Sequence, residues 1–188
     1  MSRHVASCSF GKDSVATVLL AIEHGEPLDE VAYCEVMFDD TISGEIPEHI
    51  DFIHEKAIPA FERHGIKTVV LRSDKHTYVS SFTREIRRGK HAGQIKAFPL
   101  CGMCCIQRDC KIPPIQRYVN SLPEDTVQYI GIAKDEQERL LRLDGKRISL
   151  LDKYGYTERD AWELCKKHGL LSPIYEFTNR GGCWFCPN

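Results

Sequence analysis

The sequence predicts an α/β protein with a doubly wound parallel sheet. Short apolar runs alternate with segments in which apolar residues recur at helical spacing, and these runs cover residues 5–8, 31–38, 67–71 and 126–132. Strands that alternate with helices are typical of parallel βαβ units, and strands that are apolar throughout suit a sheet covered on both faces. The length of 188 residues fits one ordinary domain. We therefore expect a single domain over residues 1–188, with the C-terminal segment 170–188 packed on it.

Three helices are expected, each followed directly by a glycine that suits the left-handed turn ending many helices: residues 14–24, 47–64 and 157–168. The longest of them contains Pro59, which we expect to kink the helix because proline has no amide hydrogen to donate to the preceding turn. The pattern thus gives the outline of the fold, with the first helix entering directly after the first strand.

The composition argues against several classes of function. Hydrophobic residues make up 42% of the chain, charged residues make up 28%, and the formal net charge is −2. This balance gives no overall case for binding nucleic acid or a membrane surface. No run of eighteen apolar residues occurs, and the N-terminus has no secretion signal. We therefore expect a cytoplasmic protein without membrane association; the sequence indicates no oligomeric state.

One stretch, residues 73–100, departs from this balance. It holds a cluster of basic side chains: Arg84, Arg87, Arg88, Lys90, His91 and Lys96. Such a cluster can contact a phosphate or a nucleic-acid backbone. The alternative is that these side chains lie on a solvated helix face and loop, which is the more frequent role of basic clusters.

The loop after the first strand has the features of an anion site. It reads Ser-Phe-Gly-Lys-Asp-Ser over residues 9–14, at the kind of strand end where open α/β sheets bind ligands. The amides and dipole at the helix start attract an anion, Gly11 allows close approach of a phosphate, and Lys12 adds a positive charge. The Ser9 and Ser14 hydroxyls are further donors. The alternative is an ordinary turn in which Asp13 and Ser14 only cap the helix.

This hexapeptide resembles the PP-loop of ATP pyrophosphatases and of the phosphoadenosine phosphosulfate reductase family. Phe10 stands where the ATP pyrophosphatases usually carry glycine, and the Phe form is similar to the reductase and sulfurylase branch. Residues 111–115 (Lys-Ile-Pro-Pro-Ile) are similar to a Lys-x-x-Pro-Leu/Ile element of that branch, and residues 131–136 (Gly-Ile-Ala-Lys-Asp-Glu) to its Gly-Ile-x-x-Asp-Glu segment. With the cysteines, the resemblance spans residues 5–186. It implies a Rossmann-like, HUP-type PP-loop domain that binds an adenine nucleotide.

The resemblance implies a set of nucleotide-binding residues at the ends of the strands: Ser7, Ser9, Phe10, Gly11, Lys12, Asp13, Ser14, Phe38, Gly131, Asp135 and Glu136. Lys12, Asp13 and Arg139 are the candidate catalytic residues, with Arg139 holding the phosphate or sulfate of a second substrate. Asp135 and Glu136 either hold Mg²⁺ on a triphosphate or cap the helix that begins there. A competing role for Arg139 is a pair with Asp135, which on a helix surface contributes only about 0.2–0.5 kcal/mol.

Six of the nine cysteines fall into two groups. Cys101, Cys104, Cys105 and Cys110 lie within ten residues, and Cys183 and Cys186 form a C-x-x-C motif between glycines and a proline. Two thiolates at this spacing can bind one metal ion, and the upstream group offers the remaining ligands. A thiol/disulfide pair at Cys183 and Cys186 is the alternative. The three remaining cysteines stand alone in apolar surroundings and are expected in the core: Cys8, Cys34 and Cys165.

Zinc and a [4Fe–4S] cluster both take four cysteines, and spacing does not choose between them. Adjacent cysteines followed far downstream by C-x-x-C are similar to the cluster ligands of adenylylsulfate reductases. The candidate ligands, in order of preference, are Cys183, Cys186, Cys105, Cys110, then Cys104 and Cys101. Such a centre would join the C-terminal segment to the rest of the domain.

The leading functional hypothesis is an enzyme that uses Mg²⁺ and cleaves ATP to pyrophosphate and an adenylylated acceptor. One alternative is an oxidoreductase acting on adenylylsulfate or phosphoadenosine phosphosulfate with an electron-donor protein. Sulfonucleotide reductases carry a catalytic cysteine in a Glu-Cys-Gly tail, whereas this sequence ends at Asn188, directly after the C-x-x-C motif. A further alternative is a non-catalytic subunit of a DNA or RNA sulfur-modification system, with nucleic acid as its partner.

Overall fold

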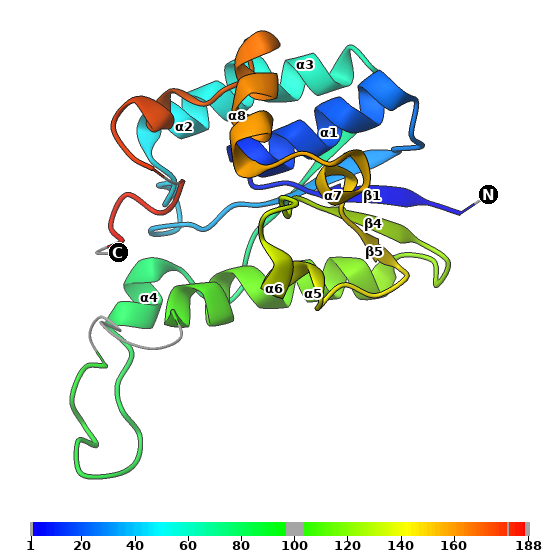
Figure 1. Ribbon diagram of the computed structural model, residues 1–188. Coiled ribbons are helices and arrows are strands. Elements are labelled where there is room, and N and C mark those ends of the chain that lie inside the picture. The colour runs from blue at the N-terminus through cyan, green and yellow to red at the C-terminus, as the bar shows by residue number, and fades with distance from the viewer. Residues whose placement is uncertain (1, 97–103, 180, 187–188) are drawn as a thin grey trace. The chain divides into compact units, whose positions relative to one another are not determined.

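The computed structural model describes residues 2–96, 104–179 and 181–186 (Figure 1). The chain folds as two compact units. The first unit consists of Met1–Tyr33, Pro47–Val70 and Leu122–Gly181, and the second consists of Cys34–Ile46, Leu71–Ser121 and Gly182–Asn188. Within the described residues, no helix is long and apolar enough to cross a membrane.

The strands form a sheet of order β3-β2-β1-β4-β5, with five strands in the described part of the chain. Their bounds are β1 (His4–Ser7), β2 (Glu30–Cys34), β3 (Lys67–Leu71), β4 (Val127–Ile130) and β5 (Arg147–Ile148). Strand β1 pairs in parallel with both β2 and β4, so that Ser7 lies opposite Ala32 and Ile130. Because β2 and β4 flank β1 on opposite sides, the carboxyl end of β1 is the topological switch point of the sheet. The predicted α/β fold with a parallel sheet is confirmed.

The helices of the first unit are α1 (Lys12–His24), α2 (Pro47–Phe52), the π-helical turn η1 (Ile53–Ala57), α3 (Ile58–Glu62), α6 (Gln137–Leu140), α7 (Leu150–Tyr154), α8 (Glu158–Lys167) and the 3-10 turn η3 (Pro173–Glu176). The second unit contains α4 (Tyr78–Phe82), the π-helical turn η2 (Gln107–Lys111) and α5 (Ile112–Ser121). Helix α1 packs against α7 and α8 (Figure 1). The predicted helices at 14–24 and 157–168 correspond to α1 and α8.

The long helix predicted over residues 47–64 is divided into α2, η1 and α3. Pro59 lies in the first turn of α3, and the wider turn η1 directly precedes it. There the amide of Ile58 bonds to the carbonyl of Ile53, five residues earlier. A proline that cannot donate to the preceding turn is therefore accommodated by a π-helical turn, which is one recognised cause of a bend in a helix.

The strand predicted over residues 31–38 is wrong in its second half, because β2 ends at Cys34. Residues 36–44 instead form a tight turn of the second unit, in which the Phe38 amide bonds to the Ile42 carbonyl and the Gly44 amide bonds to the Val36 carbonyl. Asp39 accepts the amide of Ile42 at 2.7 Å. The apolar residues of this half pack on the second unit's own cluster rather than in the sheet.

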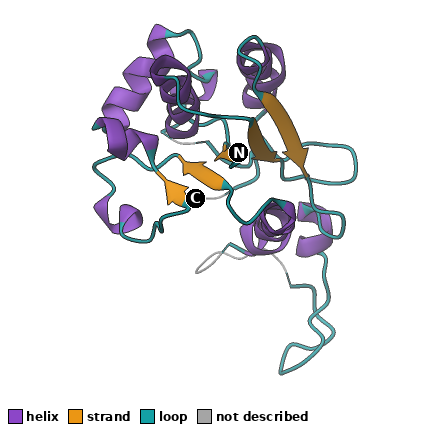
Figure 2. Ribbon diagram, turned by 90° about the vertical axis from the view of Figure 1, so that its right-hand side faces the viewer, coloured by secondary structure: helices purple, strands orange, loops and turns teal. Residues whose placement is uncertain are grey.

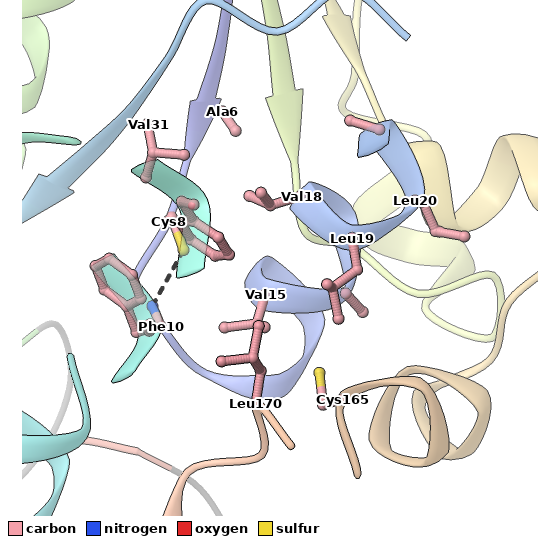
Figure 3. Packing of buried hydrophobic residues seen from close by; sticks show 14 of the residues in the cluster. Ala6, Cys8, Phe10, Val15, Val18, Leu19, Leu20, Val31, Cys165 and Leu170 are labelled. Atoms are coloured by element: carbon pink, nitrogen blue, oxygen red, sulfur yellow. Dashed lines mark hydrogen bonds between the residues drawn. The ribbon is translucent and has the colours of Figure 1, made fainter. Parts of the chain in front are cut away.

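The core of the first unit forms around α1 and the strands β1 and β2. Figure 3 shows Val15 and Val18 of α1 directed toward the cluster that contains Ala6 and Val31. Cys8 and Cys165 are buried in the same cluster, and Cys34 is buried in the second unit, so the prediction of three core cysteines is confirmed. The first turn of α1 is thus held by a packed interior.

Phe10 is the most constrained residue of the loop between β1 and α1. Its φ is +58°, a left-handed conformation in which glycine is normally favoured, and its side chain is fully buried. The ring stacks on Phe61 with centroids 5.8 Å apart and meets Tyr33 edge-on at 5.2 Å. We infer that ring burial offsets the cost of the left-handed backbone, which explains why this position tolerates a residue other than glycine.

Replacing Phe10 separates these two effects. We expect Phe10→Ala to lower the free energy of unfolding by about 3–5 kcal/mol, because the ring contacts are lost and a cavity is left. Phe10→Gly loses the same ring but accepts the positive φ, so it should be more stable than Phe10→Ala by about 1 kcal/mol. Urea unfolding followed by circular dichroism measures both values. Phe177→Ala, at a side chain that is 60% exposed, is the control, with an expected change below about 0.5 kcal/mol.

An alanine variant as stable as the glycine variant would contradict the left-handed backbone at this position. A loss no larger than that of Phe177→Ala would contradict the burial of the ring.

Candidate functional site

The loop between β1 and α1 is shaped by hydrogen bonds within its own residues. Gly11 is the N-cap of α1, with an extended backbone, and its carbonyl accepts the amide of Val15 at 3.0 Å. The Ser14 hydroxyl donates to the same carbonyl at 2.9 Å, and the Cys8 thiol donates to the Ser14 hydroxyl at 3.4 Å. The loop therefore leaves the switch point of the sheet and presents the first amides of a 13-residue helix, which have no partners within the helix.

Gly131, directly after β4, touches the first turn of α1. A Cβ atom at this position would lie 2.8 Å from the Ser14 nitrogen and 2.9 Å from the Asp13 carbonyl carbon, distances that side chains do not tolerate. The neighbouring atoms belong to the backbone and cannot rotate away. Glycine is therefore required for the two segments singled out by the sequence, 9–14 and 131–136, to meet.

Lys12 is held between two carboxylates. Its Nζ lies 3.0 Å from both oxygens of Asp13 and 2.7 Å from Oε2 of Glu158, at the first position of α8. Burial lowers the pKa of Lys12, but the hydrogen bonds to Glu158 and Asp13 outweigh it, and the pKa lies above its usual value. Lys12 is therefore a cation at neutral pH.

Several carboxylates lie close to Lys12 and to one another. Burial raises the pKa of Asp13, the hydrogen bond from Lys12 lowers it, and the charges of Glu158 and Glu136 raise it again, so that the pKa lies above its ordinary value. An anion alone would meet repulsion here, whereas phosphates accompanied by a divalent cation would not. Mg²⁺ ordinarily binds through one or two carboxylates together with substrate phosphates and water. Among the described residues, no three His, Cys, Asp or Glu side chains are arranged to hold a metal ion by themselves.

Asp135 and Glu136 are both engaged with protein donors. The Asp135 carboxylate accepts the amide of Glu158 at 3.1 Å, so it caps α8 rather than the helix that follows it. Glu136 accepts the amide of Ala133 at 3.1 Å and also pairs with Arg139. The competing role considered for Arg139, a pair with Asp135, is therefore not the one formed, because the short helix α6 begins after Glu136 and places Arg139 three residues from that partner.

Three residues that the sequence did not single out complete the surroundings of the loop. The Tyr175 hydroxyl accepts the amide of Lys12 at 2.9 Å, and it would lie 3.2 Å from a Cβ on Gly11. Buried His49 contacts the Ser172 hydroxyl through Nδ1 at 2.8 Å and the Ser9 carbonyl through Nε2 at 3.2 Å. The segment that contains η3 is thus tied to the loop, and no local sequence signal connects residues so distant along the chain.

The other expected nucleotide-binding residues are placed as follows. Ser7 is the last residue of β1, and the Ser9 side chain is exposed. The ring of Phe10 lies in the core, so only its backbone remains a candidate contact (Figure 3). Phe38 belongs to the second unit, where it stacks on Tyr78 with ring centroids 5.2 Å apart.

The cysteine groups lie in the second unit. Cys110 is 1% exposed and forms a small hydrophobic cluster with Val36 and Ile106, against which Cys104 and Cys183 pack. The C-x-x-C segment is tied to residues 43–45 by a bridge between Glu45 and Cys183 and by the amide of Trp184, which donates to the Gly44 carbonyl at 3.0 Å. Within the motif the Cys186 amide donates to the Cys183 carbonyl at 2.9 Å, which gives the tight turn expected of this spacing.

The cysteines proposed as metal ligands differ in their burial. Burial raises the pKa of Cys183 to about 12, and the neighbouring charge of Glu45 acts in the same direction. Cys105 is half-buried, Cys186 is exposed, and Cys101 lies outside the described residues. Three of the thiols therefore pack around one cluster, and the described cysteines do not form a closed metal-binding arrangement.

The fold and the loop together define an α/β protein of Rossmann-like topology, with a lysine-bearing loop at the switch point of its sheet. A solved structure, U34-tRNA thiolase NcsA from Methanococcus maripaludis with its [4Fe–4S] cluster, is similar to this chain with a TM-score of 0.51 and 15% sequence identity. The similarity covers 98% of this chain but only 60% of that one, so the chain spans about 60% of NcsA. At this identity the likeness shows the fold. No family model matches the sequence, and no curated protein matches it at a significant level.

Enlarging Gly131 tests the close approach that brings the two segments together. We expect Gly131→Ala to lower the free energy of unfolding by about 1–3 kcal/mol, because the added methyl group pushes against backbone atoms of α1. Gly145→Ala is the matched control, since a Cβ there meets nothing within 4 Å, and we expect a change below about 0.5 kcal/mol. Thermal and urea unfolding measure both. Equal effects of the two substitutions would contradict the contact.

Proposed function

We propose that this chain binds ATP through the loop 9–14 and cleaves the bond between the α and β phosphates, releasing pyrophosphate and transferring the adenylyl group to an acceptor. The observation that carries the proposal is the position of Lys12 and the first amides of α1 at the switch point, in contact with the segment that begins at Gly131. The resemblance of both segments to PP-loop proteins supports the same nucleotide.

The residues around the loop suit binding of a triphosphate together with a cation. The amides of Asp13 and Ser14 in the first turn and the Lys12 ammonium group attract the phosphates, and both stabilise the charge that develops on the departing pyrophosphate. Asp13 and Glu158 hold the Lys12 ammonium group beside the first turn of α1. Mg²⁺, when bound with the nucleotide, would neutralise part of the charge on the leaving group.

Arg139 remains the candidate for holding the second substrate. Its side chain is 53% exposed, and its ion pair with Glu136 joins neighbours within a single turn. Such exposed pairs contribute only about 0–1 kcal/mol, so an incoming phosphate or sulfate can compete for the guanidinium group.

Substitution of Lys12 tests the assignment. In isothermal titration with ATP and Mg²⁺, we expect Lys12→Met to weaken binding about 10- to 100-fold, because a charge-assisted hydrogen bond contributes about 1.5–3 kcal/mol. Lys153→Met is the control, since Lys153 also pairs with a carboxylate, Glu26, away from the loop. Product analysis with candidate acceptors should give pyrophosphate and an adenylylated acceptor.

Two results would overturn the proposal. One is ATP binding that Lys12→Met and Lys153→Met leave equally tight. The other is formation of ADP and inorganic phosphate, which would mean cleavage at the β–γ bond.

We also propose that Cys183, Cys186, Cys105 and Cys110 hold a metal centre. The tight turn of the C-x-x-C motif and the packing of Cys110 and Cys183 on one cluster support it. The NcsA structure contains a [4Fe–4S] cluster, and we therefore favour a cluster over zinc. Soft thiolates suit either metal, and a cluster would add the capacity for electron transfer.

Metal analysis of anaerobically purified protein tests this centre. We expect about four irons per chain and a brown charge-transfer absorption, against about one zinc and no colour for a zinc site. Cys183→Ser should remove the metal, whereas Cys165→Ser, at a buried cysteine of the first unit, should retain it. Full metal content in Cys183→Ser, or none in the unmodified protein, would contradict the centre.

A further inference from the structure

The basic cluster noted in the sequence lies on a hairpin-like arm of the second unit, which we define as residues 84–96 and call the basic arm. It follows α4 as the long loop seen in Figures 1 and 2. Glu85 and Ile95 form an antiparallel bridge, the Ile86 amide bonds to the Gln94 carbonyl at 2.8 Å, and the Lys96 amide bonds to the Arg84 carbonyl at 2.8 Å. These bonds hold the two sides of the arm together, so its side chains project from a defined backbone and not from a helix.

The arm concentrates positive charge in an otherwise acidic chain. It carries Arg84, Arg87, Arg88, Lys90 and Lys96 against the single acidic residue Glu85, while the whole chain has a net charge of −2. Outside the arm, acidic residues therefore exceed basic ones. A local excess of this kind raises the potential at one place on a molecule that is not basic overall.

Most of these cations are not neutralised by the protein. Arg84 lies 3.4 Å from Asp109. In the described part of the chain, no carboxylate pairs with Arg87, Arg88 or Lys90, and all three side chains are exposed. Solvated basic residues usually alternate with acidic ones on a surface, which relieves their mutual repulsion. The arm lacks this relief, and a bound polyanion would supply it.

Exposed aromatic surface stands at the base of the arm and indicates which polyanion. The ring of Tyr78 in α4 lies tilted against that of Phe185 with centroids 4.0 Å apart, and Phe185 meets Trp184 edge-on at 5.3 Å. Trp184 is 46% exposed, although its ring nitrogen is fixed by donation to the Ser43 carbonyl at 3.1 Å. An anchored ring with an open face at one end of the arm, and unpaired cations along the arm, together can bind unpaired bases and their phosphates.

We propose that the basic arm binds the backbone of a single-stranded nucleic acid and that Trp184 stacks on one of its bases. Arg87, Arg88 and Lys90 contact phosphates, and the exposed face of Trp184 contacts a base. This binding surface belongs to the second unit alone, and its test needs no ATP. Failure of the ATP assignment would therefore leave it standing, and the reverse also holds.

Anisotropy titrations of a labelled single-stranded RNA with the full chain, over a series of salt concentrations, test the phosphate contacts. The triple variant Arg87→Gln, Arg88→Gln, Lys90→Gln should bind at least tenfold more weakly at moderate salt. Its slope of log K against log salt should be smaller by about 2, because each lost phosphate contact on a single strand removes about 0.7. The control is Lys56→Gln, Arg63→Gln, Lys67→Gln, which removes the same charge from exposed positions of the first unit.

We expect the control variant to bind within about twofold of the unmodified protein, since long-range charge effects are screened at moderate salt. Circular dichroism melts should show both triple variants folded, because every substituted side chain is exposed. Equal weakening by the two variants, or unchanged binding by the arm variant, would overturn the role of the arm.

Tryptophan fluorescence tests the stacking contact. The chain has two tryptophans, Trp162 and Trp184, so Trp184→Phe identifies which one responds. Single-stranded RNA should quench the emission of the unmodified protein, and heparin, a polyanion without bases, should not. The quenching should disappear in Trp184→Phe. Quenching that persists in this variant, or that heparin also produces, would overturn the base contact.

Competition experiments distinguish a single-stranded nucleic acid from other polyanions as the ligand of the arm. Single-stranded DNA should compete with the RNA, because the shared chemistry is a phosphate backbone with unpaired bases. Duplex RNA or vesicles of anionic phospholipid that compete as well as the single strand would overturn the proposal.

Discussion

The backbone contact between Gly131 and the first turn of α1 is the constraint on which the candidate nucleotide site depends. It sets the distance between the end of β4 and the loop that leaves β1, at the place where the strand order reverses. No side chain mediates the contact, so it cannot be adjusted by a rotamer change. The loop 9–14 and the segment that begins at Gly131 are therefore held in fixed positions relative to β1 and β4.

Packing in the core fixes the shape of the loop 9–14 as much as hydrogen bonds do. The Phe10 ring lies among other aromatic rings, and the Cys165 thiol donates to the Lys12 carbonyl at 3.2 Å from the opposite side. Ser14 uses its hydroxyl on the Gly11 carbonyl. Residues proposed to bind the nucleotide thus have structural roles as well, so the stability of each variant has to be measured beside its ligand binding.

The local parts of this structure could be predicted from the sequence, and the long-range parts could not. Strands β1, β3 and β4 and helices α1 and α8 are marked by apolar runs, helical spacing and terminal glycines. The end of β2 at Cys34 could not be predicted, because Val36 is as apolar as a strand residue but packs in the second unit. Glu158 and Tyr175 contact Lys12 across 146 and 163 residues, and nothing near them in the sequence signals that contact.

The same distinction between local and long-range features applies to the ion pair of Arg139 and to the two groups of cysteines. A pair of Arg139 with Asp135 was the alternative role that the sequence offered, but the first turn of α6 pairs Arg139 with Glu136, a difference of one residue that spacing does not resolve. The C-x-x-C turn was predictable because two cysteines and their neighbours define it locally. Which upstream thiols accompany it depends on packing around Cys110, and only the folded second unit determines that.

The hydroxyl of Tyr175 has a further consequence for the order in which the molecule is assembled. Because Tyr175 follows Lys12 by 163 residues, the Lys12 amide cannot make this bond until most of the chain has been synthesised. Closing so long a loop is slow and entropically costly, and the contact is made only when most of the chain is present. The loop 9–14 of a nascent chain therefore lacks a hydrogen bond that the finished protein has, and its final form is reached only late in synthesis.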